Sequence, residues 1–586
     1  ELAFVDQITL DEPWSLVEAF STMHRWRPED VNLAGREIAG RLEKLGIPYE
    51  MHQPEIFLSI PMGSSVEAGG ATFKAKSPSS SLSVPGGLTG ELVYLPANVK
   101  ALRSYTKSVT ELFGRKPEEL ADVTERIRGR ILITEGFGNP ALTQIVEEWG
   151  GIGVIAINPG VDIHWGTCTT VWGSPDLDDL PRRPTVPVVA VSKPVGQQLK
   201  AIAEAGGSVT IRTEMLEGWF PQSIPVTRIP GAIEPEKFVL LHGHYDSWEV
   251  GVGDNATGDA TMLELARVFW ANRDKLRRSI WIAWWPGHST GRYAGSTWFA
   301  DNYAIELDEN CVAQVNCDSP GCRWATSYHH TTAMSETAGL VTSAIASASN
   351  GRIATMRPHR AGDYSFNNIG ISSFYMLSST MPDDLRAEKN YYDVSGCGGN
   401  IAWHTEHDTL EIADRDVLLT DMRIYLLSVL RVANAPVLPF DWRAVTDEFA
   451  ATIAGYETSG RNMFDLALAK SACAGLATAL DDLTAAAAHG SVPTRSLNDV
   501  SQRLARILVP INHTREARFR HDPAFTVPPL PTIAVVGELA DIEPERRGFA
   551  LVQATRGQNR LVAALRDAER LVRSVLSNST ALAAEG

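Results

Sequence analysis

The sequence predicts an α/β fold: a mostly parallel sheet flanked by helices, with an inserted smaller α/β domain and a C-terminal helical bundle. Three observations predict it. Strand-like apolar runs alternate with helical segments after Glu236, β-rich runs broken by glycine and proline precede them, and alanine and leucine at helical spacing dominate after Pro439. Such alternation is typical of parallel sheets. The predicted domains are the main domain (1–60 and 230–440), the insert (61–229) and the helical domain (441–586).

The pattern of the N-terminal residues predicts helices, and that of the insert predicts short strands. Asp11-Glu12-Pro13 supplies a helix start, residues 32–45 have apolar side chains at helical spacing, and Gly46-Ile47-Pro48 ends that helix. Residues 142–149 form a short amphipathic helix within the insert. The strand-like runs of the insert are Glu91–Leu95, Arg130–Ile133, Gly153–Ile157 and Pro187–Val191.

The main domain continues with buried strands and helices. Phe238–Leu241 is a continuous apolar run, as expected of a strand buried on both faces, and a second such strand spans Ser279–Trp285. Helices are expected at Ala260–Ala271 and from about Gly295. Functional side chains are therefore expected in loops at the carboxyl ends of the strands. In the helical domain, the apolar spacing predicts helices at 442–456, 463–488, 497–509 and 545–576, and the prolines predict a loop at 525–532.

Composition excludes several classes of partner. The 586 residues include 53 Lys and Arg against 70 Asp and Glu, a net charge of −17, which argues against nucleic-acid and anionic-membrane binding. The sequence contains no uninterrupted apolar stretch of about 18 residues, so we expect no membrane span. The six cysteines are too few and scattered for a disulfide framework and are expected to be free thiols. We expect a cytoplasmic protein, with secretion as the alternative.

Four polar segments carry the candidate chemistry. His244 and Asp246 form an HxD motif after an apolar strand, Asp254 lies in a glycine-flanked loop before a helix, Asp318 closes another strand, and His404 lies in a polar loop. In an HxD motif the histidine can bind a metal while the aspartate accepts its other ring N–H. Taken singly, each histidine is also compatible with a core or surface role, and each aspartate with a helix cap or a turn.

The order and setting of these residues resemble peptidase family M28, the zinc aminopeptidase family, and within it the branch of glutamate carboxypeptidase II and the transferrin receptor. The resemblance implies that His244, Asp254, Asp318 and His404 hold one or two Zn²⁺ ions, or another divalent transition metal, with Asp254 as the shared bridge. It also implies that the insert is a protease-associated domain, and that the helical domain is a dimerisation domain that makes the chain a homodimer.

One departure from the family pattern concerns the general base. The family has two adjacent glutamates after the next strand, one acting as base and one binding the second metal, whereas this chain has His288 and Ser289. A neutral histidine can take a proton near neutral pH, and it can equally replace the lost carboxylate as a ligand. The remaining alternative is a relic loop in a non-catalytic protein.

The residues expected to contact substrate also differ from the family. Trp403 replaces a tyrosine before the metal-binding histidine, and the insert loop with Trp165 and Trp172 lacks the expected arginine. Aromatic walls suit a non-acidic ligand, although packing at a domain interface explains these tryptophans equally well. Arg360 and Asp363 occupy a loop that lines the pocket in relatives.

Together these features predict a metal-dependent hydrolase that cleaves an amide-type C–N bond in a small or short peptide-like, non-acidic substrate. Asp246 would orient His244, and His288 would replace the missing glutamate base. Two alternatives remain: a metal-dependent lyase or other non-peptidase enzyme on this scaffold, and a non-catalytic, transferrin-receptor-like binding protein.

Overall fold

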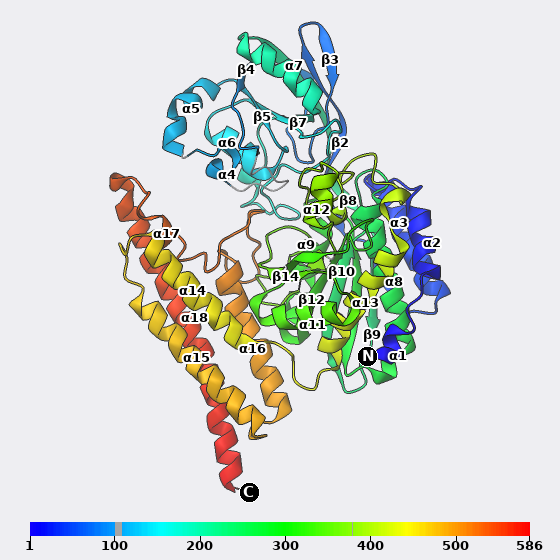
Figure 1. Cartoon of the computed structure of the whole chain (residues 1–586), viewed down its shortest axis with the longest axis vertical. Coiled ribbons are helices and arrows are strands. Elements are labelled where there is room, and N and C mark those ends of the chain that lie inside the picture. Colours follow the sequence, from blue (N-terminus) through cyan, green and yellow to red (C-terminus); the bar gives the residue numbers. More distant parts are fainter. Residues whose placement is uncertain (100–107, 116, 375, 378, 586) are drawn as a thin grey trace.

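A computed structural model describes residues 1–99, 108–115, 117–374, 376–377 and 379–585. Two large sheets and a helical bundle organise the chain (Figure 1). The main domain comprises residues 1–54 and 222–440, the insert 55–221 and the helical domain 441–585. In Figure 1 the insert lies at the top, the main domain at the lower right and the helical domain at the left.

The main domain contains a six-stranded mixed sheet. Strands β11, β10, β12 and β15 run parallel to one another, β9 pairs antiparallel with β11, and β1 pairs antiparallel with β9. In spatial order the strands are β1 (Glu50–His52), β9 (Ile224–Ile229), β11 (Arg278–Trp285), β10 (Glu234–His244), β12 (Cys311–Asp318) and β15 (Met376–Leu377). A separate parallel pair joins β13 (Tyr328–Thr332) to β14 (Ile353–Met356).

Helices cover both faces of this sheet. Side chains of α2, α3, α8, α11 and α13 share one apolar core with it, and those of α9 and α10 share another. The α-helices of the main domain are α1 (Leu2–Val5), α2 (Asp11–Phe20), α3 (Pro28–Lys44), α8 (Thr257–Ala271), α9 (Ala294–Asn302), α10 (Ala304–Asn310), α11 (Ala338–Ala348), α12 (Asp383–Glu388) and α13 (Arg415–Asn434). Short helical turns are η3 (Val252–Ala256), η4 (Arg273–Lys275), η5 (Ser335–Thr337), η6 (Cys397–Gly399) and η7 (Leu410–Ile412).

The insert is built on a seven-stranded sheet. Its strands are, in spatial order, β3 (Ala71–Lys74), β2 (Glu55–Ala68), β8 (Ser208–Pro221), β4 (Val84–Tyr94), β5 (Ile131–Glu135), β6 (Gly153–Ile157) and β7 (Val188–Val191). Its helices are α4 (Val109–Phe113), η1 (Pro117–Leu120), α5 (Ala121–Ile127), α6 (Pro140–Glu148), η2 (Leu180–Arg182) and α7 (Lys193–Glu204). Because β2 begins at Glu55 and β9 joins the other sheet, this sheet spans 55–221 rather than the expected 61–229.

The helical domain packs α14, α15, α16 and α18 around one apolar core. Its helices are α14 (Trp442–Ser459), α15 (Ala467–Ala488), α16 (Thr494–His513), α17 (Val535–Glu538) and α18 (Pro544–Glu585). The Asp441 side chain caps α14 by accepting two backbone N–H groups. Within the described residues, no helix is both long and apolar enough to cross a membrane. The predicted fold class, an α/β sheet with an inserted α/β domain and a helical bundle, is confirmed.

Candidate metal centre

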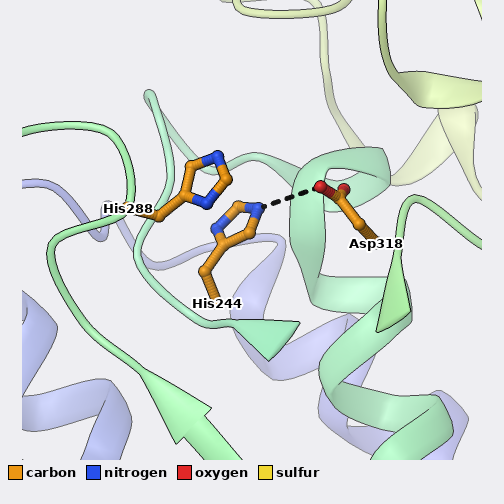
Figure 2. Close-up of side chains that lie close together, drawn as sticks. All are labelled: His244, His288 and Asp318. Atoms are coloured by element: carbon orange, nitrogen blue, oxygen red, sulfur yellow. Dashed lines mark ion pairs between the residues drawn. The ribbon is translucent and has the colours of Figure 1, made fainter. Parts of the chain in front are cut away.

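The ends of two adjacent parallel strands bring the first candidate ligands together. β10 ends at His244 and β12 ends at Asp318, and His242 lies opposite Asn316 in the register. The carboxyl ends of parallel neighbours lie at one edge of a sheet. Both side chains are buried, and His244 Nε2 lies 3.8 Å from Asp318 Oδ2 (Figure 2).

Asp254 lies between two histidines that are far apart in the sequence. Its Oδ1 atom is 3.1 Å from His244 Nε2, and its Oδ2 atom is 3.1 Å from His404 Nε2. Asp254 belongs to η3, at the start of α8, and His404 comes from the loop before η7. One carboxylate thus presents a separate oxygen to each imidazole, which is the arrangement expected of a bridging ligand.

Backbone carbonyls fix the tautomer of both imidazoles. His244 Nδ1 lies 2.8 Å from the Asp246 carbonyl, and His404 Nδ1 lies 3.0 Å from the Trp165 carbonyl. A carbonyl only accepts, so each Nδ1 carries the hydrogen and each Nε2 is available toward Asp254. The expected carboxylate contact of Asp246 is therefore wrong in detail, because its Oδ1 is 4.0 Å from His244 Nδ1 and the backbone carbonyl makes the contact.

The Asp246 carboxylate instead holds the loop that carries His288 and Ser289. Its two oxygens accept the backbone N–H groups of His288, at 3.0 Å, and Ser289, at 3.1 Å. These contacts place the His288 ring against that of His244, with centroids 3.7 Å apart and planes 18° apart. One ligand atom each of His244, His288 and Asp318 lie within 4.8 Å of one another (Figure 2).

The His288 ring contacts the carboxylate of Asp363, a residue that was expected to contact substrate. His288 Nδ1 donates to Asp363 Oδ2 at 2.8 Å, and Asp363 is fully buried. Burial alone raises the pKa of Asp363, but the charge and hydrogen bond of His288 hold that pKa below its ordinary value. The ionised carboxylate fixes the His288 hydrogen at Nδ1 and leaves Nε2 as the free ring nitrogen.

The electrostatics of the centre suit a cation. Burial alone would lower the pKa of His244, yet the nearby carboxylates of Asp254 and Asp318 hold that pKa well above its ordinary value. Burial alone would raise the pKa of Asp254, yet the neighbouring imidazoles of His244 and His404 hold that pKa well below its ordinary value. Across the described residues, His244 Nε2 and Asp254 Oδ1 are buried atoms without a hydrogen bond. Imidazole and carboxylate are ordinary zinc ligands, so these residues fit a zinc ion.

Two further residues brace the centre, and the sequence interpretation did not assign them a role. The Asp408 carboxylate accepts the backbone N–H groups of Gly253, at 2.7 Å, and Asp254, at 3.0 Å. Asn255 donates to the carbonyls of His244 and Cys317, so it ties the ends of β10 and β12 together. The signal for Asp408 was its place four residues after His404, in the same polar loop.

The residues expected to contact substrate lie mostly in packed interfaces. Trp172 is 2% exposed and Trp403 5%, and the Trp403 ring stacks on that of His404 with centroids 3.7 Å apart. Arg360 is wrong as a free substrate-binding group, because its guanidinium lies over the Trp172 ring and donates to the carbonyls of Asp522 and Pro523. Trp165 is half-buried and stacks on Trp248.

Comparison with known proteins finds relatives of part of this chain. The family model of peptidase family M28 matches residues 226–427. Mouse aminopeptidase NAALADL1 is 38% identical over 94 residues, covering 15% of this chain and 12% of the relative. A probable glutamate carboxypeptidase of maize, VP8, is 26% identical over 236 residues, covering 38% of this chain and 32% of the relative. The matches span less than half the length of these curated relatives.

Solved structures share the fold at low sequence identity. An aminopeptidase from Aneurinibacillus sp. strain AM-1 has a TM-score of 0.53 and 18% identity, covering 74% of this chain and 96% of that one. A zinc aminopeptidase from Bacillus subtilis has a TM-score of 0.53 and 16% identity, covering 73% and 96%. The predicted resemblance is confirmed for the main domain: residues 226–427 match the model of peptidase family M28, and the fold is that of the aminopeptidases compared.

Proposed function

We propose that this chain is a metal-dependent hydrolase that cleaves an amide-type C–N bond in a small, non-acidic substrate. The observation that carries the proposal is the position of the Asp254 carboxylate, 3.1 Å from the Nε2 atoms of His244 and His404. Asp318 adds a second carboxylate near the same Nε2 atom of His244, at 3.8 Å. These four residues would hold one or two zinc ions.

A bound zinc ion would act as a Lewis acid on the scissile carbonyl and would lower the pKa of a water molecule. The protein itself supplies the proton transfer. His288 Nε2 would take a proton from the attacking water and return it to the leaving nitrogen, while Asp363 holds the ring and stabilises the imidazolium. In this role His288 replaces the glutamate of the family pattern.

The preference for a non-acidic substrate is supported by two cations near the centre that are already bonded to protein groups. Arg360 lies in the loop where a substrate-binding cation was expected, but its guanidinium is bonded to backbone carbonyls. Lys76 contacts the His404 loop, where its ammonium is paired with Glu406 at 2.7 Å. A carboxylate on the substrate would have to displace these contacts.

The test compares neutral with acidic dipeptides and amides, with the zinc-loaded protein in water enriched in ¹⁸O. We expect turnover of neutral substrates, with ¹⁸O in the carboxyl group of the product, and at least tenfold lower kcat/KM for acidic ones. No turnover of any substrate, or an acidic preference, would contradict the proposal.

One observation favours a different role for His288 within the same centre. Its nearness to His244 and Asp318 is also compatible with coordination of a metal in place of the missing glutamate. Products that contain no ¹⁸O from the solvent would support the alternative that the protein is a lyase. A metal content of less than one ion per purified chain would support the alternative that the protein is a non-catalytic binding protein.

A further inference from the structure

The loop that carries His404 is joined to the insert by a reciprocal pair of hydrogen bonds. The Trp165 N–H donates to the His404 carbonyl at 2.8 Å, and the Trp165 carbonyl accepts from His404 Nδ1 at 3.0 Å. The second bond fixes the imidazole that faces Asp254. One candidate ligand of the main domain is therefore oriented by the backbone of another domain.

The neighbouring insert residue extends this contact with its side chain. His164 Nδ1 donates to the Trp403 carbonyl at 2.7 Å, and His164 Nε2 accepts from the Tyr392 hydroxyl at 2.8 Å. The backbone N–H of His164 donates to Asn158 Oδ1, just after β6, so the loop is anchored to the insert sheet. His164 is 3% exposed, so these bonds have little competition from water.

Ion pairs at the rim join the same two segments. Lys76 of the insert pairs with Glu406 at 2.7 Å, and Asp162 pairs with His407 at 3.3 Å. His404 itself has a φ of 57°, in the left-handed region that non-glycine residues seldom adopt. Such a conformation persists where surrounding contacts determine it, and here the insert makes many of those contacts.

We propose that the insert segment His164–Trp165 is a positioning element for His404, so that the metal affinity of the centre depends on how the insert docks. The inference rests on the proposed function, because it takes His404 as a metal ligand. Displacement of the insert would release the ring from the Trp165 carbonyl and free Nε2 to turn away from Asp254. Domain docking would thus regulate the centre.

The experiment measures zinc affinity by competition with a chromophoric chelator for the full-length wild type and the His164→Ala variant. Loss of partners that orient a metal ligand typically lowers affinity 10- to 100-fold, and we expect a loss in this range for His164→Ala. His513→Ala is the matched control, because it removes a buried imidazole from α16 in the helical domain. Its zinc affinity should stay within twofold of the wild type.

Two conservative variants keep the test decisive if His164→Ala does not fold. The amide nitrogen of asparagine occupies the place of Nδ1 and can donate to the Trp403 carbonyl, whereas that of glutamine occupies the place of Nε2. We expect His164→Asn to retain zinc affinity and His164→Gln to lose it. Equal zinc affinities for wild type and both amide variants would overturn the inference alone. A wild type that binds no zinc would overturn the inference and the proposed function together.

Discussion

His288 lies where the sequence analysis expected a glutamate base, and its surroundings favour the role of base. Its Nδ1 is held by the buried carboxylate of Asp363, and its ring lies flat against His244. An imidazole backed by a carboxylate is a common general base, because the carboxylate fixes the tautomer and stabilises the protonated ring. A ligand role would need only the free Nε2, and metal content distinguishes the two.

We expect His288→Ala to lower kcat by about 10²- to 10⁴-fold, the usual contribution of a general base, and to retain the zinc content of the wild type. The measurements are steady-state kinetics and elemental analysis of the same preparation. A variant that has lost zinc would identify His288 as a ligand, and unchanged kcat would remove it from the mechanism.

Asp363 should act through His288. We expect Asp363→Asn to lower kcat about 10- to 100-fold with little change in zinc content, because asparagine preserves the shape but lacks the charge that stabilises the protonated ring. The pH profile of kcat should shift as well, since a purely structural role would leave it unmoved. An identical profile and kcat would argue against the pairing.

At the scale of elements, the centre depends on the turn η3 and the loop that follows His404. Asp408 accepts two consecutive N–H groups of η3, and burial raises the pKa of its carboxyl to about 7. Removing the acceptor would leave two buried donors unpaired, at about 1–3 kcal/mol each.

We therefore expect Asp408→Ala to lower the free energy of unfolding by about 2–6 kcal/mol and to weaken zinc binding, because Asp254 belongs to the same turn. Denaturant unfolding and zinc titration measure the two effects. Asp414→Ala is a matched control: Asp414 also accepts two N–H groups, but at the start of α13. It should cost about 1 kcal/mol and leave zinc affinity unchanged. Equal effects of the two variants on zinc would count against the bracing role of Asp408.

The junction between η5 and the helical domain predicts a pH dependence. Glu336 is buried in η5, and its backbone carbonyl accepts from Asp441 at the start of α14. Burial raises the pKa of Glu336 from 4.5 to about 7. The unfolded chain therefore ionises this group first, and its contribution to stability, complete below pH 4.5, is lost as pH rises toward 7.

The expected loss is about 3 kcal/mol, because the pKa rises from 4.5 to about 7 and one pKa unit corresponds to about 1.4 kcal/mol. Glu336→Gln removes the titration, so its stability relative to wild type should increase by about this amount between pH 4.5 and 8. Chemical denaturation at several pH values measures the difference. A pH-independent difference would show that Glu336 does not titrate across this range.

At the scale of the whole molecule, the sequence predicted the features that depend on the order of residues along the chain, namely strands, helices and motifs. The apolar runs located β10 and β11, and the HxD motif after β10 indicated the metal centre. Contacts that depend on tertiary packing could not be predicted in this way. His288 and Asp363 are 75 residues apart, and His164 and Trp403 are 239 apart, so only the folded loops bring them together. Likewise, burial of Trp172 beneath Arg360 depends on how the domains pack.

The whole molecule should also be stabilised by the metal, because the centre joins β10, β12, η3 and the loop after η6, and the insert braces it. A ligand that binds only the folded state stabilises it by about 2.7 kcal/mol at 100 times its dissociation constant. We expect zinc at that ratio to raise the melting temperature of the wild type relative to the chelated protein, by calorimetry. Asp254→Ala should abolish most of this increase, because it removes the oxygens facing both His244 and His404, whereas Asp414→Ala should preserve it. An equal increase in wild type and Asp254→Ala would mean that zinc stabilises the fold from another site.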